Sequence, residues 1–184
     1  MSQAESSRPE RLFIGVPITS DARVAIQRAL PKTLPGKVVA LDKWHFTLRF
    51  LGATTGEARE VIIAQLSAAE LGPAFQVRFG GLGAFPNPRR ARILWLGLTR
   101  GGERLSELAA IAEGAARSAG FAAEGRGFTP HLTLSRIDPP QNISALLAQK
   151  HTYGVEMTVP ALILYRSLLG GGPARYEEVA RYDL

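Results

Sequence analysis

The sequence of 184 residues contains no cysteine. This absence excludes a disulfide framework, a thiolate zinc site and a cysteine nucleophile. Hydrophobic stretches are short, and none approaches the roughly 18 residues that a membrane-spanning helix needs. With 46% hydrophobic and 21% charged residues, the composition is typical of a globular protein with its own core. We therefore expect a protein without membrane spans, which any compartment could hold and which the cytoplasm would hold most simply.

Acidic side chains are fewer than basic ones, 16 against 22, which leaves a formal net charge of +6. Such a balance fits either a polyanionic partner or an ordinary soluble surface. The first ten residues, MSQAESSRPE, are polar and lack the apolar segment of a signal peptide. We expect residues 1–10 to be a disordered lead and residues 11–184 to form one bilobal domain.

Hydrophobic spacing predicts interleaved strands and helices. Helices are expected from Ser20 or Asp21 to about Leu30, from Thr55 to Gly72, over Glu103–Ala119 and over Ile143–Gln149. Strands are expected at Arg11–Pro17, in two pieces of Lys37–Gly52 around Asp42–Trp44, at Phe75–Phe85 and Ile93–Leu98, from His131 onward, and at Val155–Leu169 and Tyr176–Tyr182. Turns are expected at Pro86–Arg90, Asp138–Gln141 and Gly170–Pro173.

One short motif occurs twice in this pattern. His45-Phe46-Thr47-Leu48 returns as His131-Leu132-Thr133-Leu134, 86 residues later. Because residues i and i+2 of a strand point to the same face, each histidine should lie beside its threonine while the apolar residues enter a core. The repeat predicts an α+β fold of two pseudo-symmetric lobes of antiparallel sheet with flanking helices, arranged around a central cleft that holds both histidines.

The paired motif suits acid–base chemistry on a phosphodiester. The imidazole pKa, about 6.5, allows one ring to take a proton from water while the other gives a proton to the leaving oxygen. Threonine hydroxyls can hydrogen-bond the non-bridging phosphate oxygens. No metal-ligand spacing accompanies the motif, so we expect hydrolysis without a metal or other cofactor.

These residues resemble a known family. The paired His-x-Thr-Leu is similar to the signature of the two-histidine phosphoesterase superfamily, and more narrowly of its RNA 2′,3′-cyclic phosphodiesterase branch, also called 2′-5′ RNA ligase-like. RLFIGVP, WHFTLRFLG, LGAFPNPRRARILWLGL, GFTPHLTLSR and the closing YRSLLGGGPARYEEVARYDL occur in the family's order. The resemblance implies His45 as proton donor, His131 as proton acceptor, and Thr47 and Thr133 as phosphate-binding residues.

Two further residues follow from the resemblance. Arg136 lies five residues after His131, where the family has a phosphate-binding arginine, and Phe50 lies at the equivalent place after His45, where an aromatic ring stacks a base. Strict alternation would turn both side chains toward the core, so each role requires the strand to end or bulge first. For Phe50, a place in the core is the competing interpretation.

The remaining candidates have plainer interpretations. Arg89 and Arg90 follow a turn and could be solvated or could guide an RNA backbone, and His151 is expected on the surface. We expect a monomer that opens RNA 2′,3′-cyclic phosphate ends to 2′-phosphomonoesters. Ligation of 2′-5′ RNA ends, hydrolysis of a small cyclic or 2′-5′-linked nucleotide, and a non-catalytic RNA-binding module remain as alternatives.

Overall fold

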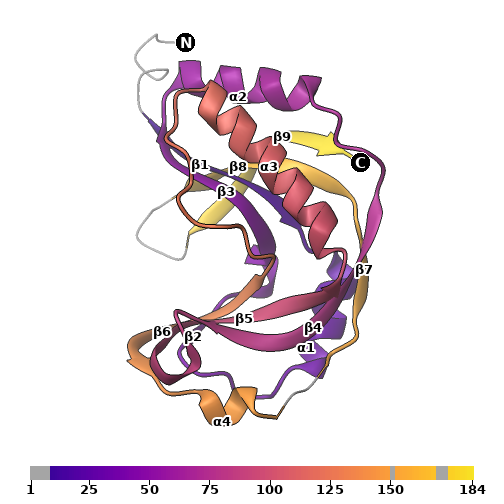
Figure 1. Cartoon of the computed structure of the whole chain (residues 1–184), viewed down its shortest axis with the longest axis vertical. Coiled ribbons are helices and arrows are strands. Elements are labelled where there is room, and N and C mark those ends of the chain that lie inside the picture. The colour runs from indigo at the N-terminus through magenta and orange to yellow at the C-terminus, as the bar shows by residue number, and fades with distance from the viewer. Residues whose placement is uncertain (1–8, 150–151, 169–173) are drawn as a thin grey trace.

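The computed structural model describes residues 9–149, 152–168 and 174–184 as one curved antiparallel sheet with helices packed against it (Figure 1). The strands are β1 (Glu10–Pro17), β2 (Lys37–Val38), β3 (His45–Thr54), β4 (Phe75–Phe85), β5 (Ala91–Arg100), β6 (Leu132–Gln141), β7 (Glu156–Val159), β8 (Ala161–Leu168) and β9 (Arg175–Asp183). The helices are α1 (Ser20–Ala29), α2 (Gly56–Ala68), α3 (Gly102–Ser118) and α4 (Ser144–Leu147), with short 3₁₀ turns η2 (Leu41–Lys43) and η3 (Pro88–Arg90).

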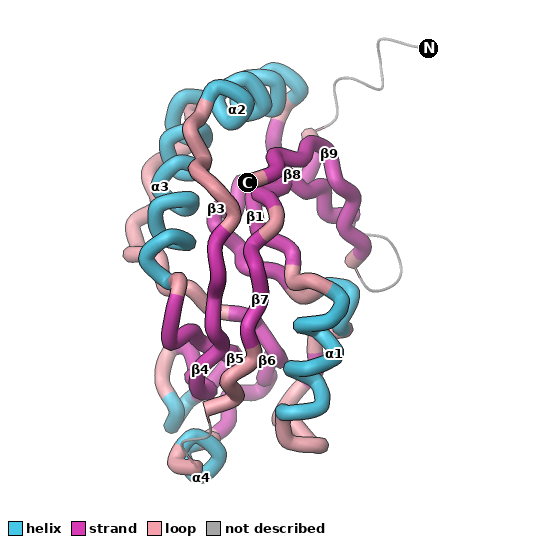
Figure 2. The backbone as a smooth tube through the Cα atoms, turned by 90° about the vertical axis from the view of Figure 1, so that its right-hand side faces the viewer, coloured by secondary structure: helices cyan, strands magenta, loops and turns pink. Residues whose placement is uncertain are grey.

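The strand order divides the sheet into two halves. The order is β7-β4-β5-β6-β3-β1-β8-β9, with β2 paired to β6. We call β1, β3, β8 and β9 the upper half and the other five strands the lower half, as they lie in Figure 1. Helices α2 and α3 lie beside the upper half and α1 beside the lower half (Figure 2). The predicted α+β fold with two lobes of antiparallel sheet is confirmed, and the two lobes form one continuous sheet.

Local sequence explains the two long helices. The Thr55 side chain accepts a hydrogen bond from the Ala58 amide and caps α2. Helix α3 follows Gly101, whose positive φ of 81° suits glycine, and a Cβ there would lie 2.5 Å from the Gln76 carbonyl oxygen. The buried side of α3 is spaced as a helix requires and is formed by Leu105, Leu108, Ala109, Ala112, Ala115 and Ala116. No helix in these described ranges is long and apolar enough to cross a membrane.

Several expected boundaries differ from the structure. Strand β1 begins at Glu10, inside the segment expected to be disordered, because the Glu10 carboxylate pairs with Arg59 and Arg166. Residues 1–8 of that segment lie outside the described residues. The expected turn at Asp138–Gln141 belongs to β6, whose far end pairs with β5 through Gln141 and Ala91. The expected helix at Ile143–Gln149 is shortened to the single turn of α4.

The expected strand Val155–Leu169 is two strands in different halves. Pro160 separates β7, which pairs with β4, from β8, which pairs with β1 and β9. Proline has no amide hydrogen to donate to a ladder, and it marks the point where the chain leaves the lower half for the upper half. The turn expected at Gly170–Pro173 lies outside the described residues.

Candidate active site

The two motifs meet where the upper and lower halves of the sheet join. Phe46 of β3 and Leu132 of β6 are register partners, and both side chains are fully buried. Their neighbours His45, Thr47, His131 and Thr133 therefore project from the opposite face, which we call the histidine face. In an antiparallel pair with this register, His45 and His131 are diagonal neighbours, with a separation of about 7–8 Å between such positions. One phosphoryl group can fit between imidazoles placed in this way.

Both imidazoles are oriented by the backbone in the same manner. The Nδ1 atom of His45 lies 2.7 Å from the Lys43 carbonyl oxygen, and Nδ1 of His131 lies 2.7 Å from the Thr129 carbonyl oxygen. Because a carbonyl only accepts, each Nδ1 carries the hydrogen and each Nε2 is the atom that can take or give a proton. The Thr47 hydroxyl lies 2.9 Å from Nε2 of His45 and donates to it in the neutral form.

Aromatic side chains surround each imidazole. His45 packs against Phe13, Tyr176 and Tyr165, at 4.7, 5.3 and 6.2 Å between ring centroids. His131 packs against Phe85 at 5.0 Å and Trp95 at 6.1 Å. These five rings lie beside the two imidazoles on the histidine face, and no motif in the sequence indicated them. They come from strands distant in sequence, and only the strand pairing brings them to the histidines.

Burial and neighbouring cations both favour neutral imidazoles. The pKa of His45 is lowered from 6.5 to about 4, chiefly by burial. The positive charges of Arg136, His131 and Arg23 contribute to this lowering, and the hydrogen bond to the Lys43 carbonyl opposes it. Burial also lowers the pKa of His131, again against its backbone hydrogen bond. No carboxylate contributes to either shift. The positive charges, with no carboxylate contributing, therefore favour the binding of an anion at this site.

Matching β-bulges follow both motifs. Leu48 has no register partner between Thr47 and Arg49, and Leu134 has none between Thr133 and Ser135. A bulge shifts the alternation of side chains by one residue. The residue two places after each unpaired leucine therefore points to the same face as the motif threonine. The roles expected for Phe50 and Arg136 each require a bulge. A bulge is present in both strands.

The bulge in β6 brings Arg136 to the histidine face. Its side chain is exposed, and no ion pair or hydrogen bond joins it to another residue in the described part of the chain. The bulge in β3 does the same for Phe50, which is 45% exposed, and the Arg11 guanidinium lies 4.8 Å from its ring centroid. The interpretation of Phe50 as a core residue is therefore wrong, because strict alternation does not hold across Leu48.

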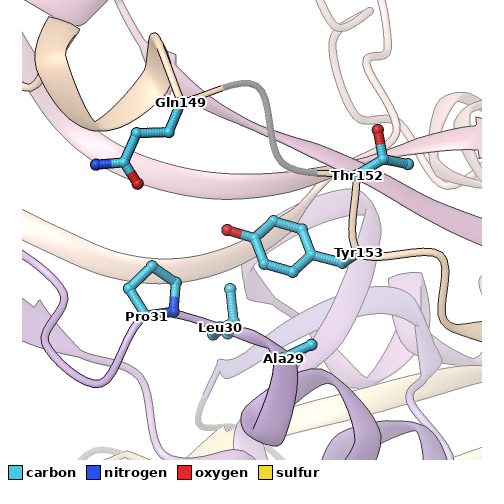
Figure 3. Close-up of a pocket in the computed structure, with 6 residues that line it drawn as sticks. All are labelled: Ala29, Leu30, Pro31, Gln149, Thr152 and Tyr153. Carbon is cyan, nitrogen blue, oxygen red and sulfur yellow. The ribbon is translucent and has the colours of Figure 1, made fainter.

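The remaining candidates are two arginines and the third histidine. Arg89 and Arg90 are exposed in η3, next to the far end of β6, and His151 lies outside the described residues. A pocket between the end of α1 and the segment after α4 is lined by Ala29, Leu30, Pro31, Gln149, Thr152 and Tyr153 (Figure 3). None of its lining residues belongs to the motifs. Within the ranges that the structure describes, no three potential metal-ligand side chains gather in one place.

Known proteins share sequence and fold with this chain. Residues 16–95 match the family model described as LigT like Phosphoesterase. A protein of Archaeoglobus fulgidus named RNA 2′,3′-cyclic phosphodiesterase is 33% identical over 180 residues, which cover 94% of this chain and 99% of that protein. A protein of Aeropyrum pernix with the same name is 35% identical over 114 residues, 62% of this chain.

The chain spans only part of some relatives. It matches between 56% and 64% of the length of three of them, the Aeropyrum pernix protein included. Among solved structures, that of Escherichia coli LigT complexed with NADP+ superposes with a TM-score of 0.77 at 27% identity, over 97% of this chain and 99% of that one. Sequence similarity over nearly the whole chain and the shared fold lead to one conclusion: the chain belongs to the LigT-like phosphoesterase family.

Proposed function

We propose that this protein hydrolyses the 2′,3′-cyclic phosphate ends of RNA to 2′-phosphomonoesters, using His45 and His131 and no metal. The observation that carries this proposal is the matched orientation of the two imidazoles, each with Nδ1 bonded to the carbonyl two residues earlier. That bond leaves two Nε2 atoms on one face, one on each side of the junction between β3 and β6. Such a pair can serve an in-line displacement at phosphorus.

The proposed step moves one proton at each end of the reaction. Nε2 of His131 accepts a proton from water while the water oxygen forms a bond to phosphorus. The bond from phosphorus to the 3′-oxygen breaks, and Nε2 of His45 gives its proton to that oxygen. The product carries a 2′-phosphate and a 3′-hydroxyl. Proton exchange with solvent then restores both imidazoles.

Polar groups beside the imidazoles can hold the phosphate during this step. Thr47 and Thr133 lie on the histidine face and can donate to the non-bridging oxygens. Arg136, which has no partner among the described residues, can bind the same oxygens through two parallel N–H groups. Phe50, exposed beyond Thr47, is proposed to stack a base. Both imidazoles come from one chain, so we propose that a monomer is sufficient.

The assigned roles require substrate to change the protonation of His45. In the free protein its pKa of about 4 keeps it neutral near pH 7, whereas a proton donor must begin protonated. A bound phosphate is negatively charged, and an opposite charge at short distance favours the protonated imidazole. We propose that phosphate binding and proton uptake by His45 occur together.

The proposal is tested with a short RNA that ends in a 2′,3′-cyclic phosphate. His45→Ala and His131→Ala should each lower turnover by at least about 100-fold with an unchanged circular dichroism spectrum, since each removes one proton-transfer group. His151→Ala replaces the third histidine and serves as the control, with turnover expected at the wild-type rate. Wild-type turnover in either motif variant would reject the two-histidine mechanism.

The products separate the remaining alternatives. Phosphorus NMR should show a 2′-phosphomonoester, whereas a 3′-phosphate would reverse the assumed orientation or exchange the histidine roles. RNA binding with no turnover by the wild-type protein would indicate a binding module instead. A 2′,3′-cyclic mononucleotide that reacts as well as the oligonucleotide would indicate a small-molecule enzyme, and joining to an added 5′-hydroxyl end would indicate ligation.

A further inference from the structure

Arg23, on the first turns of α1, differs from the other partly buried arginines of the described residues. Four of the five form ion pairs with glutamates: Arg49 with Glu113, Arg59 with Glu10, Arg104 with Glu107 and Arg166 with Glu10. Arg23 forms no ion pair or side-chain hydrogen bond with any residue that the structure describes. Its Nε atom is buried without a hydrogen-bond partner, as is that of Arg166, but Arg166 also forms ion pairs through its terminal nitrogens. A guanidinium group whose Nε atom is buried without a partner, and which has no carboxylate beside it, is a candidate to hold an anion through its terminal nitrogens.

The fold brings Arg23 to the imidazole of the first motif. Pro17, the last residue of β1, is the register partner of His45. Only Ile18 and Thr19 separate β1 from α1, and the Ile18 amide donates to the carbonyl of Trp44, the residue before His45. Helix α1 therefore starts beside the start of β3, and Arg23 lies in its second turn. Burial raises the pKa of Tyr165, but the charge of Arg23 opposes this rise, and the same charge helps to lower the pKa of His45. The ring centroids of His45 and Tyr165 lie 6.2 Å apart, so one cation near both would act in this way.

Arg23 and Arg136 reach the site from different elements. Arg136 lies on β6, across the junction from His45, and Arg23 lies on α1, which follows β1. The charged groups that affect the pKa of His45 are Arg136, Arg23 and the protonated form of His131, and no carboxylate is among them. Two guanidinium groups that have no acidic partner in the described ranges thus act electrostatically on His45.

The reacting phosphoryl group gains negative charge during the reaction, so the site must supply more positive charge to the product than to the substrate. A cyclic phosphodiester carries one negative charge, while the phosphorane formed by addition of hydroxide and the phosphomonoester product approach two. A single guanidinium can match the substrate, and a second one matches the additional charge. Interactions that strengthen as charge develops are those that accelerate a reaction.

We propose that Arg23 and Arg136 together form an oxyanion subsite beside His45, which binds the phosphoryl group and stabilises its second negative charge. This inference rests on the proposed function for its place in the reaction, but the subsite itself would bind any phosphate dianion. Arg23 contacts the phosphoryl oxygens directly, and it also keeps His45 neutral until the phosphate arrives.

Inorganic phosphate is the probe that tests the subsite without turnover. Its dissociation constant is measured by calorimetry at pH 7.5 for the wild type, Arg23→Gln, Arg23→Lys and Arg28→Gln. Loss of one charge-assisted contact predicts binding weaker by about 10-fold or more in Arg23→Gln, partial recovery in Arg23→Lys and no change in Arg28→Gln. Arg28 is the matched control because it is an exposed arginine on the same helix. Wild-type phosphate affinity in a folded Arg23→Gln protein would overturn the proposal.

Two further measurements distinguish a phosphate contact from a merely structural role. Imidazole NMR of free Arg23→Gln should show a higher pKa of His45 than in the wild type, because one lowering charge is gone, and Arg23→Lys should retain the lower pKa. The value of kcat/KM should fall equally for a cyclic mononucleotide and for an RNA. A fall for RNA alone would place Arg23 at a neighbouring phosphate and overturn the assignment.

The subsite and the proposed function can fail separately. If the wild-type protein hydrolyses no cyclic phosphate but Arg23→Gln still loses phosphate affinity, the subsite stands and the proposed function is rejected. If hydrolysis is observed and Arg23→Gln retains both turnover and phosphate affinity, the subsite is rejected and the function stands. Should Arg23→Gln fail to fold, Arg23→Lys with unchanged phosphate affinity and a raised His45 pKa would equally contradict the proposal.

Discussion

Phe46 and Leu132 face each other across the junction of β3 and β6, and each directly follows a motif histidine. This one register pair relates the two motifs by an approximate twofold axis through the sheet. It also fills the core below the histidine face, where the Phe46 ring stacks on Phe79 of the lower half at 5.8 Å. The residues that separate each histidine from its threonine thus hold the two halves of the sheet together.

The pH dependence of turnover should reflect the lowered pKa values of the two imidazoles. Singly protonated free enzyme is most abundant between the two pKa values, which are about 4 for His45 and below the ordinary 6.5 for His131. We expect kcat/KM to follow a bell with its maximum below pH 6.5. Bound phosphate raises both pKa values, so the maximum of kcat should lie at higher pH. Coincident maxima above pH 7 would contradict this electrostatic account.

Gly15 sets the distance between β1 and the first histidine. A Cβ at this position would lie 2.7 Å from the Phe46 carbonyl oxygen and 3.5 Å from Cδ2 of His45. Gly15→Ala should therefore lower the free energy of unfolding by about 1–3 kcal/mol and lower kcat by displacing the imidazole. Thermal denaturation and turnover measure the two effects. The control is Gly114→Ala on α3, where a Cβ meets nothing within 4 Å, and there we expect full turnover and no loss of stability.

Phe50 should contribute to RNA binding and little to folding. Because its ring is 45% exposed, Phe50→Ala should leave the melting temperature nearly unchanged. Loss of one stacked base should weaken RNA binding by about 1–3 kcal/mol, measured by fluorescence anisotropy with an unreactive RNA end. Val61→Ala, at an exposed apolar residue of α2, provides the control with wild-type affinity. A lower melting temperature with unchanged affinity would return Phe50 to a packing role.

Turnover should not depend on a divalent metal ion. The proposed mechanism assigns both proton transfers to imidazoles and charge stabilisation to guanidinium groups, which leaves no step for a metal. Excess chelator is expected to leave the initial rate unchanged. Activity that is lost on chelation and restored by added Mg²⁺ or Mn²⁺ would require a different mechanism.

The sequence was sufficient to indicate the candidate site because His45 and His131 occur in a repeated motif with a strand's period of two. It could not show the faces of Phe50 and Arg136, since each depends on a bulge that exists only in the pairing with a neighbouring strand. Arg23 was missed for a related reason. A single arginine on an amphipathic helix has the pattern of a solvated residue, and its lack of a carboxylate partner is visible only in the folded chain.

The strand boundary at Pro160 has a mechanical consequence. Val159 ends a strand of the lower half and Ala161 begins a strand of the upper half, so a single residue with a restricted φ connects them. The chain also leaves the lower half after β5, packs α3 against β3, and returns as β6. Because the chain crosses between the two halves at these points, the halves have little freedom to rotate relative to each other about a hinge. The spacing of the two imidazoles is therefore set when the chain folds, and a substrate bound between them must adapt to that spacing.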